Sequence, residues 1–273
     1  MADLTSLPPA KAWLEMSDTT GDDILLTRLI TQISGNILNY LERPCITRKT
    51  YSELRSGVNN QRLVLRNWPV ISIASLTING QNIPAAATPT SAGYTLATWD
   101  GTGSGIPQEI TLNGYRFGRG NNNIQIIYDA GYAFEDLTYT IPASAPYQIQ
   151  LNPPGGSWAQ DDGITYANGT AITPTTGAPA QGQYVVQLTS TGAANYTFSS
   201  ADAGQQILIS YSFNPAALEQ AALELIAERY KYRGRIGQSS KSLGGNETAA
   251  YSLKGMPDYI QIALDGFKKF LPL

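Results

Sequence analysis

Residues 23–41 read DILLTRLITQISGNILNYL, and this stretch decides the fold that we expect. Its apolar residues recur at spacings of three and four, which places them on one face of an α-helix. The stripe consists of Leu26, Leu29, Ile30, Ile33, Ile37 and Leu41, with Leu38 at its edge. Asp22 and Asp23 supply cap oxygens and negative charge at the helix N-terminus, and Pro44 ends the helix.

A second amphipathic helix is predicted far away along the chain, over residues 216–233. Its stripe consists of Leu218, Ala222, Leu225, Ile226 and Arg229. Pro215 lies at or near the first helical position, after Asn214 as the cap, and Gly234 is a stop signal. Neither stripe is stable when exposed to water, so we expect the two helices to pack on each other or on a shared sheet.

The segment between the helices reads as strands and turns. Asn79-Gly80 is a strong hairpin signal. Six alternating strand candidates precede residue 129, at residues 46–54, 62–65, 71–78, 94–98, 110–112 and 123–128. Residues 135–213 hold a second group of short strands, separated by proline and glycine turns, which is typical of a compact β-sandwich. We interpret this second group as a domain inserted into a loop of the host fold.

These elements predict an α+β protein, in which a helical bundle with a small antiparallel sheet carries an inserted β-sandwich domain. The predicted core is discontinuous, over residues 1–134 and 214–238, and the insertion covers residues 135–213. Residues 239–273 are predicted to be a linker and a C-terminal segment. That segment contains an amphipathic helix over residues 257–270, which either folds back on its own core or reaches into a partner.

Composition narrows the classes of function. The 273 residues contain one cysteine, Cys45, and no histidine, so an intramolecular disulfide is excluded and the commonest general base and metal ligand is missing. A formal charge of −3 argues against general adhesion to nucleic acid. The sequence shows neither a signal peptide nor the roughly 18–20 consecutive apolar residues of a membrane span. We expect synthesis in the cytoplasm.

The candidates for catalysis and ligand binding are weak. Paired carboxylates occur at Asp22-Asp23, Glu135-Asp136 and Asp161-Asp162, but neighbours on a turn rarely face one cleft, so we expect no enzyme and no cofactor. Asp161-Asp162-Gly163 lacks the further oxygen ligands that a calcium site needs, and no metal is expected. Four aromatic residues of the second strand group are able to stack on sugars or to fill a core, and we favour core filling. They are Trp158, Tyr166, Tyr184 and Tyr196.

Several segments, in this order, carry a resemblance to a known family. They are LPPAKAWL at residues 7–14, DDILL at 22–26, NYLERP at 39–44, LVLRNWPV at 63–70, IIYDAGY at 126–132, the helix at 218–233, and the ending GMP at 255–257 with the residues that follow to 270. The ordered set resembles the head-tail connector, or adaptor, proteins of tailed bacteriophages, the family typified by the connectors of lambdoid phages. The resemblance covers residues 4–133 and 214–270, and residues 135–213 lie outside it.

The resemblance implies a structural protein of the virion neck. Such a protein forms a homo-oligomeric ring, usually twelvefold, under the portal protein, where it extends the DNA channel and docks a tail or head-closure protein. DNA passes through without sequence-specific binding. The alternative is another neck or tail-completion protein, whose inserted β-domain binds a neighbouring structural protein or a glycan.

The resemblance also implies where the chain docks. The family's C-terminal segment inserts into the portal, which assigns portal binding to Met256, Tyr259, Ile260, Leu264, Phe267 and Phe270.

A basic cluster at the end of the second helix is a further candidate contact. Arg229, Lys231, Arg233 and Arg235 alternate with tyrosines, and they are predicted to contact a neighbouring subunit or the DNA channel. The competing interpretation is general, because cations are favourable at any helix C-terminus.

Overall fold

The computed structural model describes residues 3–98, 106–235, 240–242, 248–250 and 256–269. The chain forms two compact units. Of the described residues, unit 1 contains those of 1–44 and 135–268, and unit 2 contains those of 45–134 together with Lys269. The predicted insertion at residues 135–213 therefore lies in the same unit as the helices. The predicted division into a discontinuous core, an inserted domain and a C-terminal segment stays a prediction.

The expected helical bundle with a small sheet is wrong. Strands make up 41% of the described residues and helices 23%. The physical reason lies in unit 2, where the strands close around a core of their own and need no helix to cover it. This core contains twelve buried residues: Leu65, Val70, Leu76, Ile78, Ile83, Ile110, Leu112, Phe117, Ile124, Ile126, Tyr128 and Ala130.

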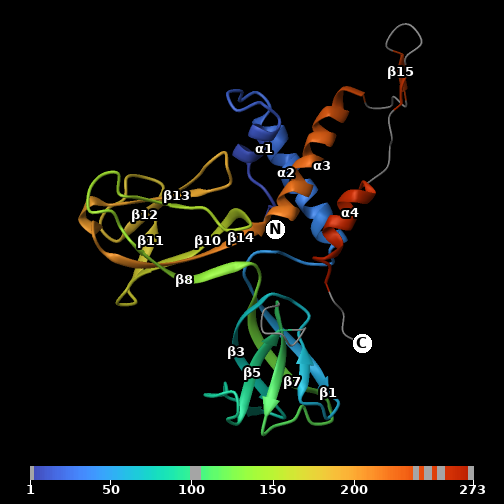
Figure 1. Ribbon diagram of the computed structural model, residues 1–273, viewed down its shortest axis with the longest axis vertical. Coiled ribbons are helices and arrows are strands. Elements are labelled where there is room, and N and C mark those ends of the chain that lie inside the picture. The colour runs from blue at the N-terminus through green and yellow to red at the C-terminus, as the bar shows by residue number, and fades with distance from the viewer. Residues whose placement is uncertain (1–2, 99–105, 236–239, 243–247, 251–255, 270–273) are drawn as a thin grey trace. The chain divides into compact units, whose positions relative to one another are not determined.

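Unit 2 consists of two antiparallel sheets that share this core (Figure 1). Its strands are β1 (Lys49–Gly57), β2 (Arg62–Val64), β3 (Val70–Ile78), β4 (Gln81–Asn82), β5 (Gly93–Thr98), β6 (Pro107–Asn113) and β7 (Gly120–Ala130). One sheet has the order β1-β7-β3-β4 and the other β2-β6-β5. The predicted hairpin is confirmed, because Asn79 and Gly80 both have positive φ and connect β3 to β4.

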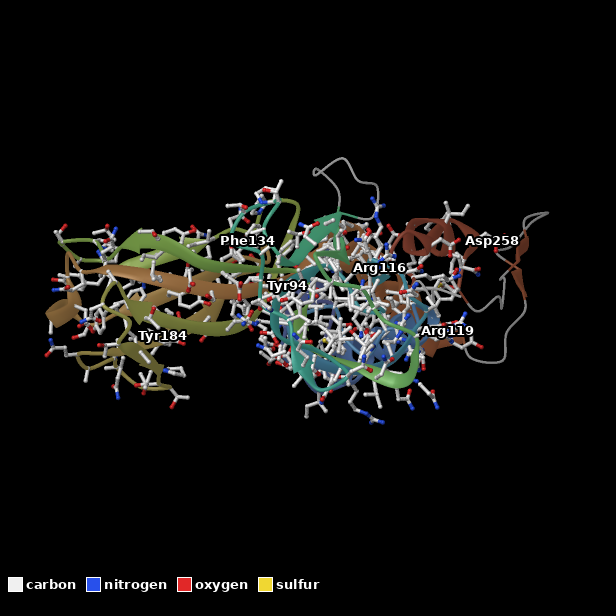
Figure 2. The ribbon with its side chains drawn as sticks, turned by 90° about the horizontal axis from the view of Figure 1, so that it is seen from below. Tyr94, Arg116, Arg119, Phe134, Tyr184 and Asp258 are labelled. Atoms are coloured by element: carbon white, nitrogen blue, oxygen red, sulfur yellow. The ribbon has the colours of Figure 1, made fainter. Side chains whose placement is uncertain are left out.

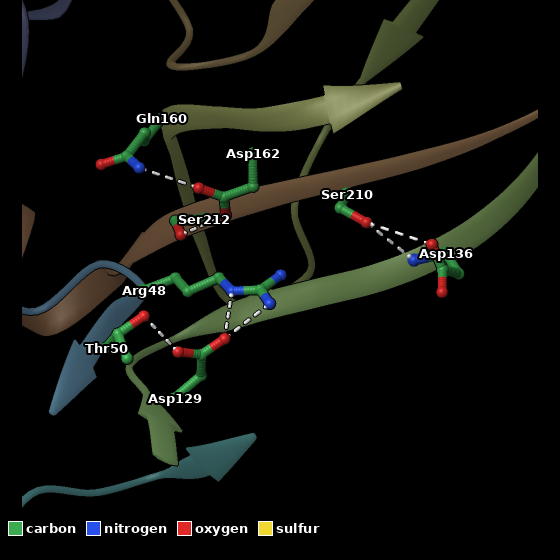
Figure 3. Close-up of polar contacts among 8 residues, drawn as sticks. All are labelled: Arg48, Thr50, Asp129, Asp136, Gln160, Asp162, Ser210 and Ser212. Carbon is green, nitrogen blue, oxygen red and sulfur yellow. Dashed lines mark hydrogen bonds and ion pairs between the residues drawn. The ribbon is translucent and has the colours of Figure 1, made fainter. Parts of the chain in front are cut away.

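Buried polar groups hold the strands of unit 2 in register. The Glu53 carboxylate on β1 accepts hydrogen bonds from the Tyr128 hydroxyl and the Arg66 backbone N–H, and it forms an ion pair with Arg55 at 3.1 Å. On the strand pair β1–β7, Arg48 and Thr50 both donate to Asp129 (Figure 3). Because its partners satisfy both oxygens of Glu53, the buried carboxylate is a structural element rather than a reactive one.

Unit 1 contains one seven-stranded sheet, not the β-sandwich that we expected. Its strands are β8 (Ala133–Thr140), β9 (Gln148–Leu151), β10 (Gly156–Tyr166), β11 (Ala171–Pro174), β12 (Gln183–Leu188), β13 (Ala194–Phe198) and β14 (Gln206–Pro215). The order is β8-β14-β10-β11-β12-β13-β9, in which β11 and β12 are parallel. The last strand, β14, leads directly into a helix and so ties the sheet to the helical layer.

The helical layer of unit 1 contains α1 (Leu7–Trp13), α2 (Asp23–Tyr40), α3 (Ala216–Tyr232) and α4 (Asp258–Asp265). Helix α3 contacts α1, α2, α4 and strand β10, and Figure 1 shows it running beside α2. Most of the predicted apolar stripe of α2 is buried, at Leu26, Ile30, Ile33, Ile37, Leu38 and Leu41, whereas Leu29 is half-buried. Two short 3-10 turns, η1 (Ser200–Asp202) and η2 (Arg233–Arg235), and the paired strands β15 (Ser240–Ser242) and β16 (Thr248–Ala250) complete the elements.

Local details of the helix ends differ from the sequence predictions. Asp22 is the N-cap of α2, but its side chain makes no capping hydrogen bond. Pro215, not Asn214, is the N-cap of α3, and the Asn214 amide donates to the Asp3 backbone carbonyl at 3.1 Å. Arg229 is exposed rather than part of the buried stripe. In the described part of the chain, no helix is long and apolar enough to cross a membrane.

Candidate functional site

The C-terminal helix α4 packs on α3 through one apolar face. Ile260 and Leu264, four residues apart, are 2% and 0% exposed. Met256 and Phe267 flank this face and are half-buried. Of the two outcomes that the sequence left open, the structure shows the helix folded back on its own unit. Four residues of the predicted portal-binding set therefore contact, at least partly, the protein's own interior.

A second apolar face of α4 points to solvent. Tyr259 and Ile262, three residues apart, are 63% and 74% exposed, and Ala263 beside them is exposed as well. The Tyr259 hydroxyl is hydrogen-bonded to Glu224 of α3, while most of its ring stays exposed. Sequence reasoning included Tyr259 and missed Ile262. The spacing of three between them was the signal for a separate stripe, but the stronger stripe of Ile260 and Leu264 obscured it.

Polar contacts fix the C-terminal end of α4. The Tyr40 hydroxyl on α2 donates to Asp265 at 2.7 Å, and Lys268 forms an ion pair with Asp265 at 2.8 Å. The Lys268 ammonium also lies 4.0 Å from the centroid of the Tyr40 ring. Lys268 and then Tyr40 lower the pKa of Asp265, while Asp265 raises the pKa of Lys268. The last predicted portal residue, Phe270, lies outside the described residues.

One residue of the predicted basic cluster, Arg233, makes contacts within unit 1. Arg233 forms a bidentate contact with Asp22, at 2.9 and 3.1 Å, and its guanidinium lies 4.4 Å from the centroid of the Tyr230 ring. The Tyr230 hydroxyl also donates to Asp22, and Arg233 and then Tyr230 lower the pKa of this carboxyl. Arg233 thus connects the end of α3 to the start of α2 within one unit.

The remaining members of the cluster are exposed or lie outside what the structure describes. Arg229 and Lys231 are exposed on α3. Exposed Arg229 shares the helix surface with Glu224 and Glu228, which are half-buried. The Arg235 side chain is outside the described part of the chain. The predicted contact of this cluster with a subunit or with DNA stays a prediction.

The aromatic residues of the seven-stranded sheet form its core. Tyr184 and Tyr196 are 1% and 0% exposed, and their rings stack at 5.8 Å between centroids. Both hydroxyls donate to Asp161, and the Trp158 indole N–H donates to the Tyr196 hydroxyl at 3.0 Å. Burial, then the Asp161 carboxylate, raise the pKa values of both tyrosines. Core filling is confirmed for this pair, since buried rings cannot stack on a sugar.

The acidic pair that we weighed for calcium binding is used by neighbouring side chains. Gln160 and Ser212 donate to Asp162 at 2.8 and 2.6 Å, and Ser210 donates to Asp136 at 3.4 Å (Figure 3). Asp136, Asp161 and Asp162 line an open hollow of about 490 Å³. Among the described residues, however, no group of three or more carboxylates, cysteines or histidines has the geometry to hold a metal ion.

One solved structure that is similar over nearly the whole chain is described as "Neck of empty GTA particle computed with C6 symmetry". The similarity covers 99% of this chain and 96% of that chain, with 12% sequence identity and a TM-score of 0.34. No protein-family model matches the sequence, and no curated protein matches it. Function is therefore inferred from the residues of this chain.

Proposed function

We propose that the chain is a non-enzymatic structural protein of the neck of a tailed phage-like particle, which assembles as a ring and docks on the portal protein through α4. One observation carries the proposal. Helix α4 has two apolar faces, of which Ile260 and Leu264 hold it on α3 while Tyr259 and Ile262 face solvent. Exposed apolar side chains gathered on one short element are typical of a protein interface.

The arrangement of the family-like segments supports the same function. The segments near residues 7–44, 218–233 and 256–269 are far apart in the sequence, yet they form the helical layer of unit 1. The segments at residues 63–70 and 126–132 belong to unit 2. The family-like segments in the helical layer are therefore brought together by the fold, although they are far apart in the sequence.

Magnitudes explain how such a helix docks reversibly. Burying Tyr259 and Ile262 gains about 1.5–3 kcal/mol for each side chain. The loss of translational and rotational freedom costs about 4–15 kcal/mol, so a single copy binds weakly. In a ring, each contact after the first is intramolecular, and effective concentration makes the assembly strong. The protein is thus expected to be free alone and bound as a ring.

The test measures mass by light scattering for the full chain, alone and mixed with the portal protein of the same particle. A double variant, Tyr259→Ser with Ile262→Ser, removes the exposed face together with the Tyr259–Glu224 hydrogen bond, and leaves Ile260 and Leu264 in place. The matched control is Ile24→Ser on α2, because Ile24 is 82% exposed and lies on another helix. We expect the wild type and the control to associate with the portal protein and the double variant to lose at least tenfold in affinity.

Equal association by all three proteins would contradict docking through the outer face of α4. Absence of association by the wild type at any concentration would contradict the portal as the partner.

A further inference from the structure

The formal charge of the protein is divided between the two units. Residues 45–134, the continuous part of unit 2, carry seven lysines and arginines and four aspartates and glutamates, which gives this segment a formal charge of +3. Since the whole chain has a charge of −3, the remaining residues carry −6. The net negative charge of the whole sequence therefore conceals a basic unit. Whether charge favours or opposes DNA binding has to be judged for each unit separately.

Three loops meet at one end of unit 2. They are the segment after β1 at residues 58–61, the turn Asn79-Gly80, and the connection from β6 to β7 at residues 114–119. Asn123 joins them, because its amide donates to Asn79 Oδ1 at 2.9 Å and to the Gly118 carbonyl at 3.0 Å, and its Oδ1 accepts from the Gly57 N–H at 2.9 Å.

Further bonds connect the same loops. The Asn59 N–H donates to the Phe117 carbonyl at 2.8 Å, and Ser56 donates to Asn121 Oδ1 at 3.1 Å. Phe117 itself is 1% exposed, so it anchors its loop in the core of the unit. The loops are thus held in fixed positions by amide groups and by one buried ring.

We name this surface the arginine–amide end and define it by residues 56–62, 79–82 and 113–123. It contains three arginines, Arg62, Arg116 and Arg119, together with eight asparagines and two glutamines, and no acidic residue. All three arginines are exposed, and Figure 2 labels Arg116 and Arg119 among the side chains.

Internal contacts use the three arginines only in part. Arg116 Nη1 donates to the Asn59 carbonyl at 3.3 Å, which orients the guanidinium over the neighbouring loop. Arg62 is 75% exposed on its side chain and lies 3.5 Å from Glu109, beyond a good hydrogen bond. Within the described residues, Arg119 has no ion-pair or hydrogen-bond partner. Guanidinium donors therefore remain available to an external ligand.

From these contacts we propose that the arginine–amide end binds the phosphate backbone of double-stranded DNA. Protein contacts to phosphate come mainly from Arg and Lys, from Asn and Gln, and from backbone N–H groups, and this surface is built of these groups. A protein partner would instead require aromatic and apolar residues at the centre, and Val58 is the one large exposed apolar residue among these three described segments. These three segments contain no helix to place in the major groove, so we expect contacts to the phosphate backbone and binding that is independent of sequence.

The inference goes beyond the proposed docking function and does not depend on it. It also assigns DNA contact to a different place from the cluster predicted at the end of α3, where Arg233 is paired with Asp22 and where Glu224 and Glu228 lie on the same helix.

The test is binding of the full chain to a fluorescent 20-base-pair duplex, measured by anisotropy at several salt concentrations. Binding of this kind has a dissociation constant of about 10⁻⁴–10⁻⁶ M at physiological salt, and the logarithm of affinity falls linearly with the logarithm of salt. The test variant combines Arg62→Gln, Arg116→Gln and Arg119→Gln. The matched control combines Arg229→Gln and Lys231→Gln on α3, which removes exposed cations from unit 1.

We expect the wild type and the control to bind alike and the test variant to lose at least tenfold in affinity. Each arginine that contacts a phosphate is expected to lower the salt slope by about 0.9 when it is replaced. No binding by the wild type at low salt, or an equal loss in the control, would overturn the proposal. Light scattering of the same proteins measures their self-association. If the test variant binds DNA normally and loses only self-association, the arginine–amide end contacts another copy of this protein, and the proposal is overturned.

Discussion

Helices α2 and α4 both carry an apolar stripe at helical spacing, but they use it differently. In α2, six apolar residues between Leu26 and Leu41 are at most 3% exposed, Leu29 of the predicted stripe is half-buried, and α3 contacts the helix. In α4, two residues are buried on α3 and two others, Tyr259 and Ile262, face solvent. The apolar residues of α2 therefore serve stability, while those of α4 form a buried face and an exposed face, and it is the exposed face that we propose docks on a partner.

The difference has a cause in length. Helix α2 spans 18 residues and buries a stripe along five turns, whereas α4 spans eight residues and offers little more than two. A helix as short as α4 is unstable by itself in water, so it depends on α3 and on the Tyr40–Asp265–Lys268 contacts. We therefore expect α4 to open locally without unfolding of the unit.

The largest expected effect is a loss of stability when a buried apolar side chain of α2 is truncated. Ile37 is 0% exposed, and Ile37→Ala is expected to lower the free energy of unfolding by about 2–5 kcal/mol, because it removes buried methyl groups and leaves a cavity. Chemical denaturation measures this change. The control is Ile24→Ala at a position 82% exposed, where a change within about 0.5 kcal/mol is expected. Equal effects at the two positions would show that α2 does not bury its stripe.

An intermediate effect is expected for the buried face of α4. Leu264→Ala is expected to release α4 locally, so that its amides exchange with solvent at least tenfold faster, while the denaturation midpoint moves less than for Ile37→Ala. Hydrogen exchange with mass spectrometry measures both regions in one experiment. Uniform acceleration across α2 and α4 would mean that the two helices unfold together, and the comparison between them would fail.

The smallest effect concerns pH. The folded pKa of Asp265 is lowered by Lys268 and Tyr40, so its contribution is present above the ordinary value of 3.8 and is lost as pH falls through the lowered pKa. We expect the end of α4 to exchange faster only below about pH 3.8. Asp265→Asn is expected to remove this pH dependence, and Glu42→Gln, at an exposed position outside the contact, is expected to keep it. An unchanged acid response in Asp265→Asn would assign it to another group.

Local patterns in the sequence were sufficient for α2. Its observed bounds, Asp23–Tyr40, agree with the predicted 23–41 because spacings of three and four over five turns leave no other period. The start of α4 was predicted as well, but its end was not, since the helix stops before Gly266 while apolar residues continue in the sequence.

Contacts between distant residues could not be predicted from the same patterns. Strand β1 pairs with β7 although the paired residues are 63 to 81 positions apart, from Gly57 with Gly120 to Lys49 with Ala130. This pairing helps to close unit 2 around its own core, and a list of separate strand candidates did not predict it. The pairing of Asp22 with Arg233 joins residues 211 positions apart. The prediction from net charge likewise used the sum over both units. It therefore missed the basic loops around Arg116 and Arg119.

The most direct test of the division within α4 uses thiol labelling. Cys45, the single native cysteine, is buried, so an introduced cysteine gives the main signal. Ile262→Cys is expected to react quickly in the free protein and to become protected when the portal protein is added, whereas Leu264→Cys is expected to react slowly in both states. Labelling of Ile262→Cys at the same rate with and without the portal protein would contradict docking through this face.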